Sequence, residues 1–576
     1  MIHYLNNESV ILSFVAPYKE SIHVVGEFNQ WQISEQYSMQ KHSDGETFSL
    51  TITGLEAQKE YAYQFLIDEK IAVSDPYCEK ILDPKFDSQI SKSTYPNLKK
   101  YPYENPFRGT VGILQISQEK YEWQENNFIC PPKTDLVIYE LLIRDFTESR
   151  KYRDIANFIP YFKQLGINAI ELMPVQEFTG NDSWGYNPTF YFAADKAYGT
   201  KNDLKYLIDK CHENSIAVIL DVVFNHADNK FAYYKAYPDY SKKHYVNPFF
   251  NQKATHPYSV FFDFNHESKY TQNFFDDVCK FWLDEYKIDG FRFDLSKGFT
   301  QVETNLDVTK WSSYDASRVR LLKRFYDKIR SYNKDCYLIL EHLAANDEET
   351  TLANYGFMLW GGLNHQFKNL LKGTVADISW LNYQNRGWKE ANLVTYMESH
   401  DEERLIFDAN KHLKNTQLAL QRAKAAVVLF FAYKGPKLLW QFGEFGYDIN
   451  IDFNGRTGIK PTKWEYLKEE NRQALFEVYR QMIHLKTSNV ALKEGIFSEN
   501  SEGLVKKIAI NHASMNIRII ANFSLKTINV VSNLEVGQWF DFYGENRIDI
   551  LKNNAKTTLN AGEFYLFTSK KLNKYL

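Results

Sequence analysis

The hydrophobic and polar positions of the chain follow three different rhythms. Up to about residue 100, short runs such as 10–15 and 61–67 alternate apolar with polar residues and are separated by glycines. A period of two predicts antiparallel strands, so we expect an N-terminal β-sandwich over residues 1–100. Four prolines between residues 102 and 132 then indicate an extended linker over residues 101–134.

Beyond residue 134, apolar runs of strand length alternate with helical stripes. Gly166 ends one such stripe, and Thr200 with Asp203 forms a capping box ahead of another. Eight strand–helix units of this kind predict a closed (β/α)8 barrel of parallel strands over residues 135–490. The eight predicted strands are 138–143, 168–173, 217–223, 288–294, 337–341, 357–360, 393–397 and 437–440.

Two further segments complete the predicted fold. Residues 227–266, after the third strand, are polar and aromatic without a period and too long for an ordinary loop, so we expect an inserted subdomain. Alternation returns over residues 491–576 and predicts a C-terminal β domain. The predicted fold class is therefore α/β: a (β/α)8 TIM barrel with one insertion, flanked by N-terminal and C-terminal antiparallel β-sandwich domains.

The composition excludes several kinds of partner. The chain has 68 Lys+Arg against 72 Asp+Glu, a net charge of -4, so no nucleic acid is expected as a partner. No apolar run is long enough to span a bilayer and no signal-peptide pattern opens the chain, so we expect a cytoplasmic protein with no membrane partner. An aromatic fraction of 16% suits stacking against sugar rings, although larger aromatic cores explain it equally well.

Acidic residues or histidines end four of the predicted strands. In a parallel barrel the loops that carry chemistry leave from the carboxyl ends of the strands, so these side chains are expected to converge on one mouth. The sequence therefore predicts an acidic active site there. The four segments are Asp221-Val-Val-Phe-Asn225-His226, Gly290-Phe-Arg292-Phe-Asp294-Leu-Ser-Lys297, Leu338-Ile-Leu-Glu341 and Met397-Glu-Ser-His400-Asp401.

In order and position, these segments resemble the four signature regions of the α-amylase family of glycoside hydrolases (family 13). The N-terminal segments 25–31 and 61–68 are similar to the glycogen-binding type of β-sandwich module that precedes branching and debranching members. Trp31 is our candidate for glucan contact by this module. The resemblance covers nearly the whole chain and is most specific over residues 135–445.

The resemblance implies a retaining mechanism, in which one carboxylate attacks and a second, about 5 to 5.5 Å away, acts as acid and base. By position Asp294 is the nucleophile, Glu341 the acid/base and Asp401 the third carboxylate, which holds sugar hydroxyls. Arg292 lies two residues before Asp294 on the same face of the strand, where its charge is expected to keep Asp294 ionised. Asp221 is expected to orient Arg292.

Further residues that match family positions are candidates for substrate contact. His226 and His400 are expected to donate to sugar hydroxyls, although a lone histidine is more often a core residue. Tyr186, next to Trp184 in the same segment, is the expected stacking platform under the reacting sugar; the alternative is a turn whose aromatics pack the loop. Lys297 is expected to contact sugars on the leaving side.

One metal site is suggested by the resemblance. Asn225 and Asp263 match two oxygen ligands of the calcium ion that pins the inserted subdomain in many relatives. Because Ca²⁺ takes six to eight oxygens, two candidates do not make a site, and a structural calcium stays an open alternative. No cofactor is expected for the chemistry itself.

The expected activity is hydrolysis of α-1,4-glucosidic bonds in starch, glycogen or maltooligosaccharides, because Lys297 matches the α-amylase pattern Asp-x-x-Lys. The alternatives are a branching enzyme, favoured by the N-terminal module and Glu402, and an α-1,6 debranching enzyme, favoured by the segment 184–188. Against branching, His342 stands where branching enzymes usually carry a small or acidic residue. A remote alternative is an inactive glucan-binding scaffold. Dinucleotide-binding, P-loop and serine-hydrolase motifs do not occur in the sequence.

Overall fold

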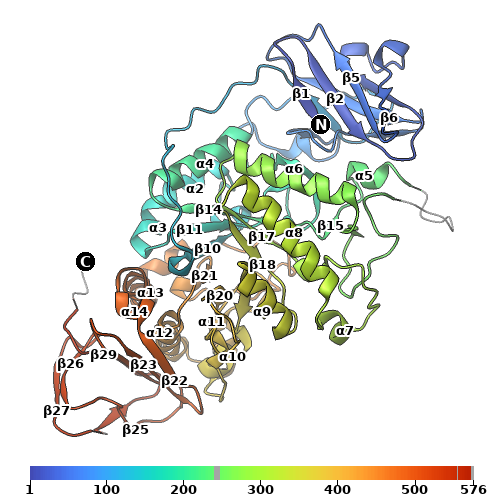
Figure 1. Cartoon of the computed structure of the whole chain (residues 1–576). Helices are drawn as coiled ribbons and strands as arrows, with labels where there is room; N and C mark the ends of the chain where they lie inside the picture. The colour runs from blue at the N-terminus through green and yellow to red at the C-terminus, as the bar shows by residue number, and fades with distance from the viewer. Residues whose placement is uncertain (239–246, 554, 573–576) are drawn as a thin grey trace.

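The computed structural model describes residues 1–238, 247–553 and 555–572. Figure 1 shows three parts along the molecule, with the N-terminal β module at the top, the helix-covered barrel in the middle and the C-terminal sheets at the bottom. This arrangement agrees with the predicted fold class, a barrel flanked by two antiparallel β parts.

The barrel has the eight parallel strands that the apolar runs predicted. Each strand pairs with the next one along the chain, and β21 pairs back with β10, so that Val137 lies opposite Lys437 and the cylinder closes. The strands are β10 (Val137–Leu141), β11 (Ala169–Leu172), β14 (Ala217–Val222), β17 (Gly290–Phe293), β18 (Tyr337–Leu340), β19 (Met358–Gly362), β20 (Leu393–Tyr396) and β21 (Lys437–Trp440).

Side chains at alternate positions of these strands point into the barrel and form layers. The lower layer is apolar and includes Ile138, Ala169, Ile219 and Ile339. Two residues further along β10, β11 and β14, the inward side chains are acidic, and β17 contributes an arginine. This polar layer consists of Glu140, Glu171, Asp221 and Arg292, all of them buried.

Helices cover the barrel, and one predicted helix is divided. The stripe expected over residues 154–166 becomes α2 (Tyr152–Ile155), a 3-10 turn and α3 (Ile159–Leu165), because Pro160 lacks the N–H that a continuous helix needs there. Gly166 then ends α3 with φ 94°, as predicted. Among the described residues, no helix combines the length and apolarity that crossing a membrane requires.

The longer helices follow the predicted alternation with the strands. They are α4 (Lys201–Glu213), α6 (Lys269–Glu285), α8 (Ala316–Tyr332), α9 (Asn346–Tyr355), α10 (Asn364–Lys372), α11 (Leu405–Leu413), α12 (Thr416–Ala432) and α13 (Glu470–Ser488). Shorter helices are α1 (Ile143–Phe146), α5 (Ala232–Lys235), α7 (Val308–Ser312) and α14 (Val490–Glu494). The predicted capping box opens α4, where the Thr200 side chain accepts from the Asp203 amide.

The N-terminal module consists of two sheets and extends into the predicted linker. Strand β9 pairs with β6 and β8 inside the second sheet, so residues 101–134 are not only a connection. The first sheet contains β1 (Ile2–Tyr4), β2 (Val10–Val15), β5 (Thr47–Ile52) and β4 (Gln40–Lys41). The second contains β3 (Ile22–Gly26), β6 (Tyr61–Ile67), β7 (Ile71–Val73), β8 (Ile81–Leu82) and β9 (Val111–Leu114).

Trp31 does not lie on the surface of this module. Its side chain is 5% exposed and packs in a cluster with Val25, Ala62 and Leu66. The hypothesis that Trp31 offers a face to glucan therefore does not fit its position, because a buried ring has no free face for a sugar.

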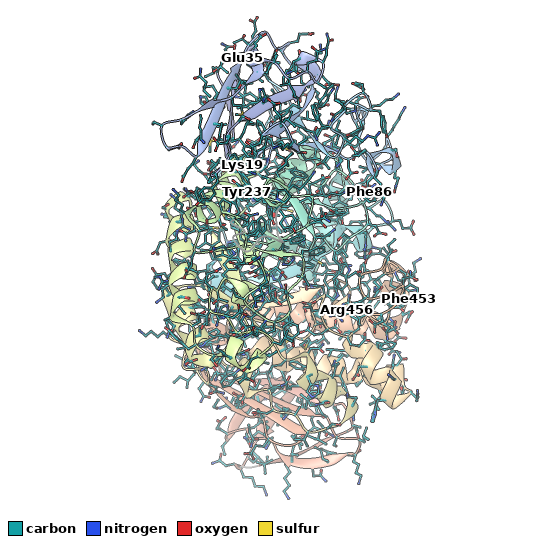
Figure 2. All side chains as sticks on the ribbon, turned by 90° about the vertical axis from the view of Figure 1, so that its right-hand side faces the viewer. Lys19, Glu35, Phe86, Tyr237, Phe453 and Arg456 are labelled. Atoms are coloured by element: carbon teal, nitrogen blue, oxygen red, sulfur yellow. The ribbon has the colours of Figure 1, made fainter. Side chains whose placement is uncertain are left out.

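The segment inserted after β14 packs against the N-terminal module. The Tyr237 hydroxyl donates to the Pro17 carbonyl over 2.8 Å, and the Phe14 and Tyr233 rings lie 5.3 Å apart. Figure 2 shows Lys19 and Tyr237 next to each other at this seam. The described part of the insertion contains α5 and the two-stranded pair β15 (His226–Ala227) and β16 (Phe262–Asp263). Residues 239–246 of the predicted subdomain lie outside the described residues.

The C-terminal part is antiparallel β structure, as the alternation predicted. Its six-stranded sheet contains β22 (Ile496–Asn500), β23 (Val505–Asn511), β24 (Ile517–Asn522), β29 (Phe564–Thr568), β26 (Gly537–Asp541) and β27 (Arg547–Ile550). A second sheet pairs β25 (Ile528–Val531) with β28 (Lys556–Leu559).

Candidate active site

Arg292 brings together the carboxylates that the sequence placed at the ends of different strands. Its Nη1 donates to Asp294 Oδ1 and to Asp221 Oδ1, each over 2.9 Å, and its Nη2 lies 3.2 Å from Glu341 Oε2. The guanidinium is fully buried and lies against Trp360, with Cζ 4.1 Å from the ring centroid. Asp294 and Glu341 therefore contact one cation on one mouth of the barrel.

The backbone fixes both of these carboxylates. The amides of Asp294 and Glu341 continue the strand ladder, donating to the carbonyls of Val222 and Phe293. The Leu295 amide donates to Glu341 Oε2 over 2.8 Å. Each carboxylate thus stands one residue beyond the end of a buried strand and has little freedom to turn away.

Burial decides the protonation behaviour of Asp294 more than Arg292 does. Burial raises the pKa of Asp294 well above its ordinary value, the Glu341 carboxylate adds to the rise, and Arg292 opposes it. The expectation that Arg292 alone keeps Asp294 ionised is therefore incomplete.

Asp401 and His400 lie beside each other above the barrel. Asp401 Oδ2 is 3.4 Å from His400 Nε2, and the Arg456 guanidinium donates to the Asp401 carbonyl over 2.6 Å. Burial by itself would raise the pKa of Asp401. The positive charges of His400, Arg292 and Arg456 outweigh burial, so that the pKa lies below its ordinary value. Figure 2 shows Arg456 near Phe453, in the loop that follows β21. Asp401 is therefore an ionised side chain that is still 43% exposed to a substrate.

Tyr186 forms a floor together with His400. The two rings stack with centroids 5.1 Å apart and an angle of 21° between their planes. The Tyr186 hydroxyl donates to Asp221 Oδ2 over 2.6 Å, and Trp184 meets the edge of His400 at 5.6 Å. The position of Tyr186 suits the predicted stacking platform, whereas Trp184 is 8% exposed and supports it from the side.

Three predicted substrate contacts are occupied by the protein itself. His400, expected to donate to sugar hydroxyls, is 3% exposed and has Glu140 at one nitrogen and Asp401 at the other. His226 is 1% exposed, its Nε2 donates to the Tyr186 carbonyl, and burial lowers its pKa to about 4. Lys297 is 7% exposed and donates to Leu343 O and Ser312 Oγ, so it joins two loops beside the site. Here the structure differs from the sequence prediction, because donor groups that serve loop carbonyls do not point at a sugar.

The side chains around Asn225 and Asp263 do not fit a calcium ion. Asp263 accepts from His256 Nε2 over 3.1 Å and from Asn251 Nδ2 over 2.7 Å, so both of its oxygens face donors. Only Asn225 Oδ1 is left as a buried oxygen without a partner. Nowhere in the described ranges do three or more His, Cys, Asp or Glu side chains group so that they could hold a metal. A hard cation needs more oxygens than this set offers.

Sequence reasoning missed Glu140 and Glu171. Glu140 Oε1 accepts from His400 Nδ1 over 2.5 Å, while both oxygens of Glu171 are buried without a partner. Both residues lie inside strands rather than after them, so a search of strand ends passes over them. The available signal was an acid at an inward position of an otherwise apolar run.

A parallel barrel whose mouth collects two carboxylates on one guanidinium defines a glycosidase-like (β/α)8 enzyme. The family model described as "Alpha amylase, catalytic domain" matches residues 151–261 and 257–473, more than half of the chain. The protein belongs to the α-amylase family and is an α-amylase-type enzyme.

Known relatives cover this chain to different extents. It is 27% identical over 293 residues to malto-oligosyltrehalose trehalohydrolase of Saccharolobus solfataricus, a match over 50% of this chain and 44% of that protein. It is 25% identical to the 1,4-alpha-glucan branching enzyme of Pseudoalteromonas atlantica, over 83% of this chain and 66% of that protein. The chain thus spans less than two thirds of either relative.

A solved structure covers almost all of the fold. Pullulanase type I from Bacillus subtilis, complexed with maltose, superposes with a TM-score of 0.75 at 18% identity, over 99% of this chain and 85% of the other. At this identity the likeness concerns the fold alone, including the β parts on both sides of the barrel.

Proposed function

We propose that the protein is a retaining enzyme that cleaves α-1,4-glucosidic bonds of an α-glucan such as starch, glycogen or maltooligosaccharides. The observation that carries the proposal is the contact of Asp294 and Glu341 with the same buried guanidinium. Retaining glycosidases require two carboxylates at one bond, one to attack and one to transfer protons. Arg292 supplies a fixed frame for such a pair.

In the proposed first step, Glu341 gives its proton to the glycosidic oxygen while Asp294 attacks the anomeric carbon. The glycosidic C–O bond breaks and a covalent glycosyl-enzyme forms. Asp401 binds hydroxyls of the same sugar and tightens its hold as the ring flattens, which favours the transition state. In the second step Glu341 takes the proton of an incoming hydroxyl, whose oxygen displaces Asp294 from the sugar.

For the incoming hydroxyl, we favour a 6-hydroxyl of a glucan chain, because attack by that oxygen makes the product an α-1,6 branch. Support comes from the curated relatives that match most of this chain, since the one from Pseudoalteromonas atlantica is a branching enzyme. The N-terminal β module in front of the barrel agrees with this architecture. Cleavage of an α-1,4 bond and formation of an α-1,6 bond then conserve the number of glucosidic bonds.

Hydrolysis is the second candidate, and one residue favours it. His342, directly after Glu341, stands where branching enzymes usually carry a small or acidic residue. In the structure it is buried, and its Nε2 lies 2.6 Å from Glu348 Oε1. Water instead of a glucan hydroxyl would then displace Asp294, and each cleavage would leave a new reducing end.

The test is to incubate the protein with amylose and with glycogen while reducing ends and α-1,6 bonds are measured in the same samples. New α-1,6 bonds without new reducing ends support transfer, and new reducing ends support hydrolysis. Loss of α-1,6 bonds from glycogen would instead identify a debranching enzyme. The Glu341→Gln variant serves as the blank, and equal change in blank and wild type would contradict the proposal.

A further inference from the structure

The His400 ring is held between two carboxylates that contact its two nitrogens. Glu140 Oε1 lies 2.5 Å from Nδ1, and Asp401 Oδ2 lies 3.4 Å from Nε2. Glu140 belongs to β10 and Asp401 to the loop after β20, so the imidazole connects two segments that are far apart in the sequence. The stacked ring of Tyr186 and the perpendicular ring of Trp184 restrict its rotation.

The chemistry of imidazole makes this arrangement informative. A neutral histidine carries one N–H and can donate from only one nitrogen, whereas the imidazolium donates from both. Carboxylates on both nitrogens therefore favour the charged ring. Burial would lower the pKa of His400, yet Asp401 and Glu140 raise it to about 10.

We infer that Glu140 is a positioning residue of the reaction, which holds His400 as an imidazolium and so keeps Asp401 correctly oriented. The inference rests on the proposed function, since Asp401 matters only if it holds sugar hydroxyls. Glu140 itself is fully buried and lies in the polar layer of the barrel, so it acts through His400 and not on the substrate.

Titratable and charged groups from five elements face the His400 ring. They are Glu140 on β10, Glu171 on β11, Asp221 on β14, Arg292 on β17, and Asp401 and Glu402 in the loop after β20. Among the described residues, Glu140 and Asp401 are the acids that contact its nitrogens.

Glu171 is a neighbour of Glu140 that offers a matched comparison. The two residues are register partners on adjacent strands, and both lie in the polar layer. Burial, together with the Glu140 and Asp221 carboxylates, raises the pKa of Glu171 well above its ordinary value. We therefore expect Glu171 to be protonated, so replacing it with glutamine removes little charge from the surroundings of His400.

The first experiment compares pH profiles of kcat/KM on amylose for wild type, Glu140→Gln and Glu171→Gln. Glutamine can still accept from Nδ1 but no longer stabilises the charge. If the pKa of His400 falls to its ordinary value of about 6.5, the imidazolium fraction at pH 8.5 drops to about one hundredth. We expect Glu140→Gln to lose activity above neutral pH and to regain it near pH 6. For Glu171→Gln we expect kcat/KM to follow the wild-type profile on the alkaline side. Parallel profiles for Glu140→Gln and wild type would overturn the inference.

The second experiment does not depend on activity. In wild type labelled with 15N at histidine, the His400 signals are identified by comparison with His400→Gln and followed from pH 6 to 9. We expect both ring nitrogens to keep the 15N shifts of an imidazolium throughout this range; shifts of a neutral ring, or a titration near pH 6.5, would refute the role of Glu140. Failure of the proposed function would show separately, as absence of glucan turnover while the His400 ring stays charged.

Discussion

Arg292 shows how one side chain can organise several strand ends. Its guanidinium touches carboxylates that follow or end three neighbouring strands, Asp221, Asp294 and Glu341. A planar fork with donors in fixed directions can hold such a set, and a lysine could not reproduce it. The spacing of two residues between Arg292 and Asp294 was visible in the sequence. The pairing with Asp221 and Glu341 follows from the register of β14, β17 and β18.

The contacts that sequence reasoning missed depend on closure of the barrel. Glu140 and His400 are separated by 260 positions, and no local pattern connects them. His226 and Lys297 were found as residues, but their partners were not, because a loop carbonyl that accepts a hydrogen bond leaves no mark in the sequence. Residue identity at strand ends was therefore predictable, and the direction of each side chain was not.

Replacing either member of the carboxylate pair should abolish turnover without unfolding the protein. We expect Asp294→Asn and Glu341→Gln each to lower kcat by roughly a thousandfold or more, because each removes an attacking or proton-transferring group at nearly constant volume. Glucan turnover and the circular dichroism melting curve measure the two effects. Asp327→Asn, on the exposed face of α8, is the control and should keep full activity. Near-normal turnover in Asp294→Asn would show that another group attacks.

The acid side of the pH profile should reflect the raised pKa of Asp294. An ordinary aspartate has a pKa of about 3.9, and burial with the Glu341 charge moves that of Asp294 upward. A higher pKa means that the carboxylate takes up its proton at a higher pH, and the protonated form cannot attack. We therefore expect kcat/KM to fall as pH drops through a value clearly above 4. Full activity down to pH 4 would contradict this.

At the scale of elements, apolar runs carried the fold prediction. Each of the eight barrel strands was predicted because a strand covered by its neighbours and helices needs a continuous apolar stretch. Short elements, and breaks within longer ones, were not predicted. Strand β9 lies in a segment with prolines on both sides. Its partner β6 is far away in the sequence, so no local pattern indicated the pairing. The division between α2 and α3 depends on a single proline.

The capping box of α4 permits a test of a predicted element. Thr200→Ala removes the side-chain acceptor for the Asp203 amide, and such a change typically costs about 1 kcal/mol. We expect a lower free energy of unfolding, with faster hydrogen exchange at the first turn of α4, and unchanged kcat per folded molecule. Thr416→Ala, at the exposed first position of α12, should change stability by less than about 0.5 kcal/mol. Equal effects of the two substitutions would mean that the box contributes nothing.

At the scale of the whole molecule, the N-terminal module packs against the catalytic part of the chain. Its Pro17 and Phe14 contact the inserted segment, and Lys196, from the barrel, pairs with Asp87 of the module over 3.2 Å. The buried position of Trp31 agrees with a packing role. The module thus lies against two segments of the catalytic part, the insertion after β14 and the residues that follow β13 (Pro188–Ala194).

Metal removal should leave this molecule unchanged. Because Asp263 already accepts from His256 and Asn251, the inserted segment is held by hydrogen bonds that need no cation. We expect EDTA treatment followed by dialysis to change neither Tm nor turnover, and added calcium to have no effect. A lower Tm after EDTA that calcium, but not magnesium, restores would show that the segment binds the ion after all.

The pairing of β10 with β21 has a consequence for synthesis on the ribosome. Roughly 300 residues separate the two strands, so at about 5 to 20 residues per second the free edge of β10 waits roughly 15 to 60 seconds for its partner. An unpaired edge invites association with other nascent chains. A chain released before Trp440 would lack the partner strand, and the edge of β10 would stay unpaired.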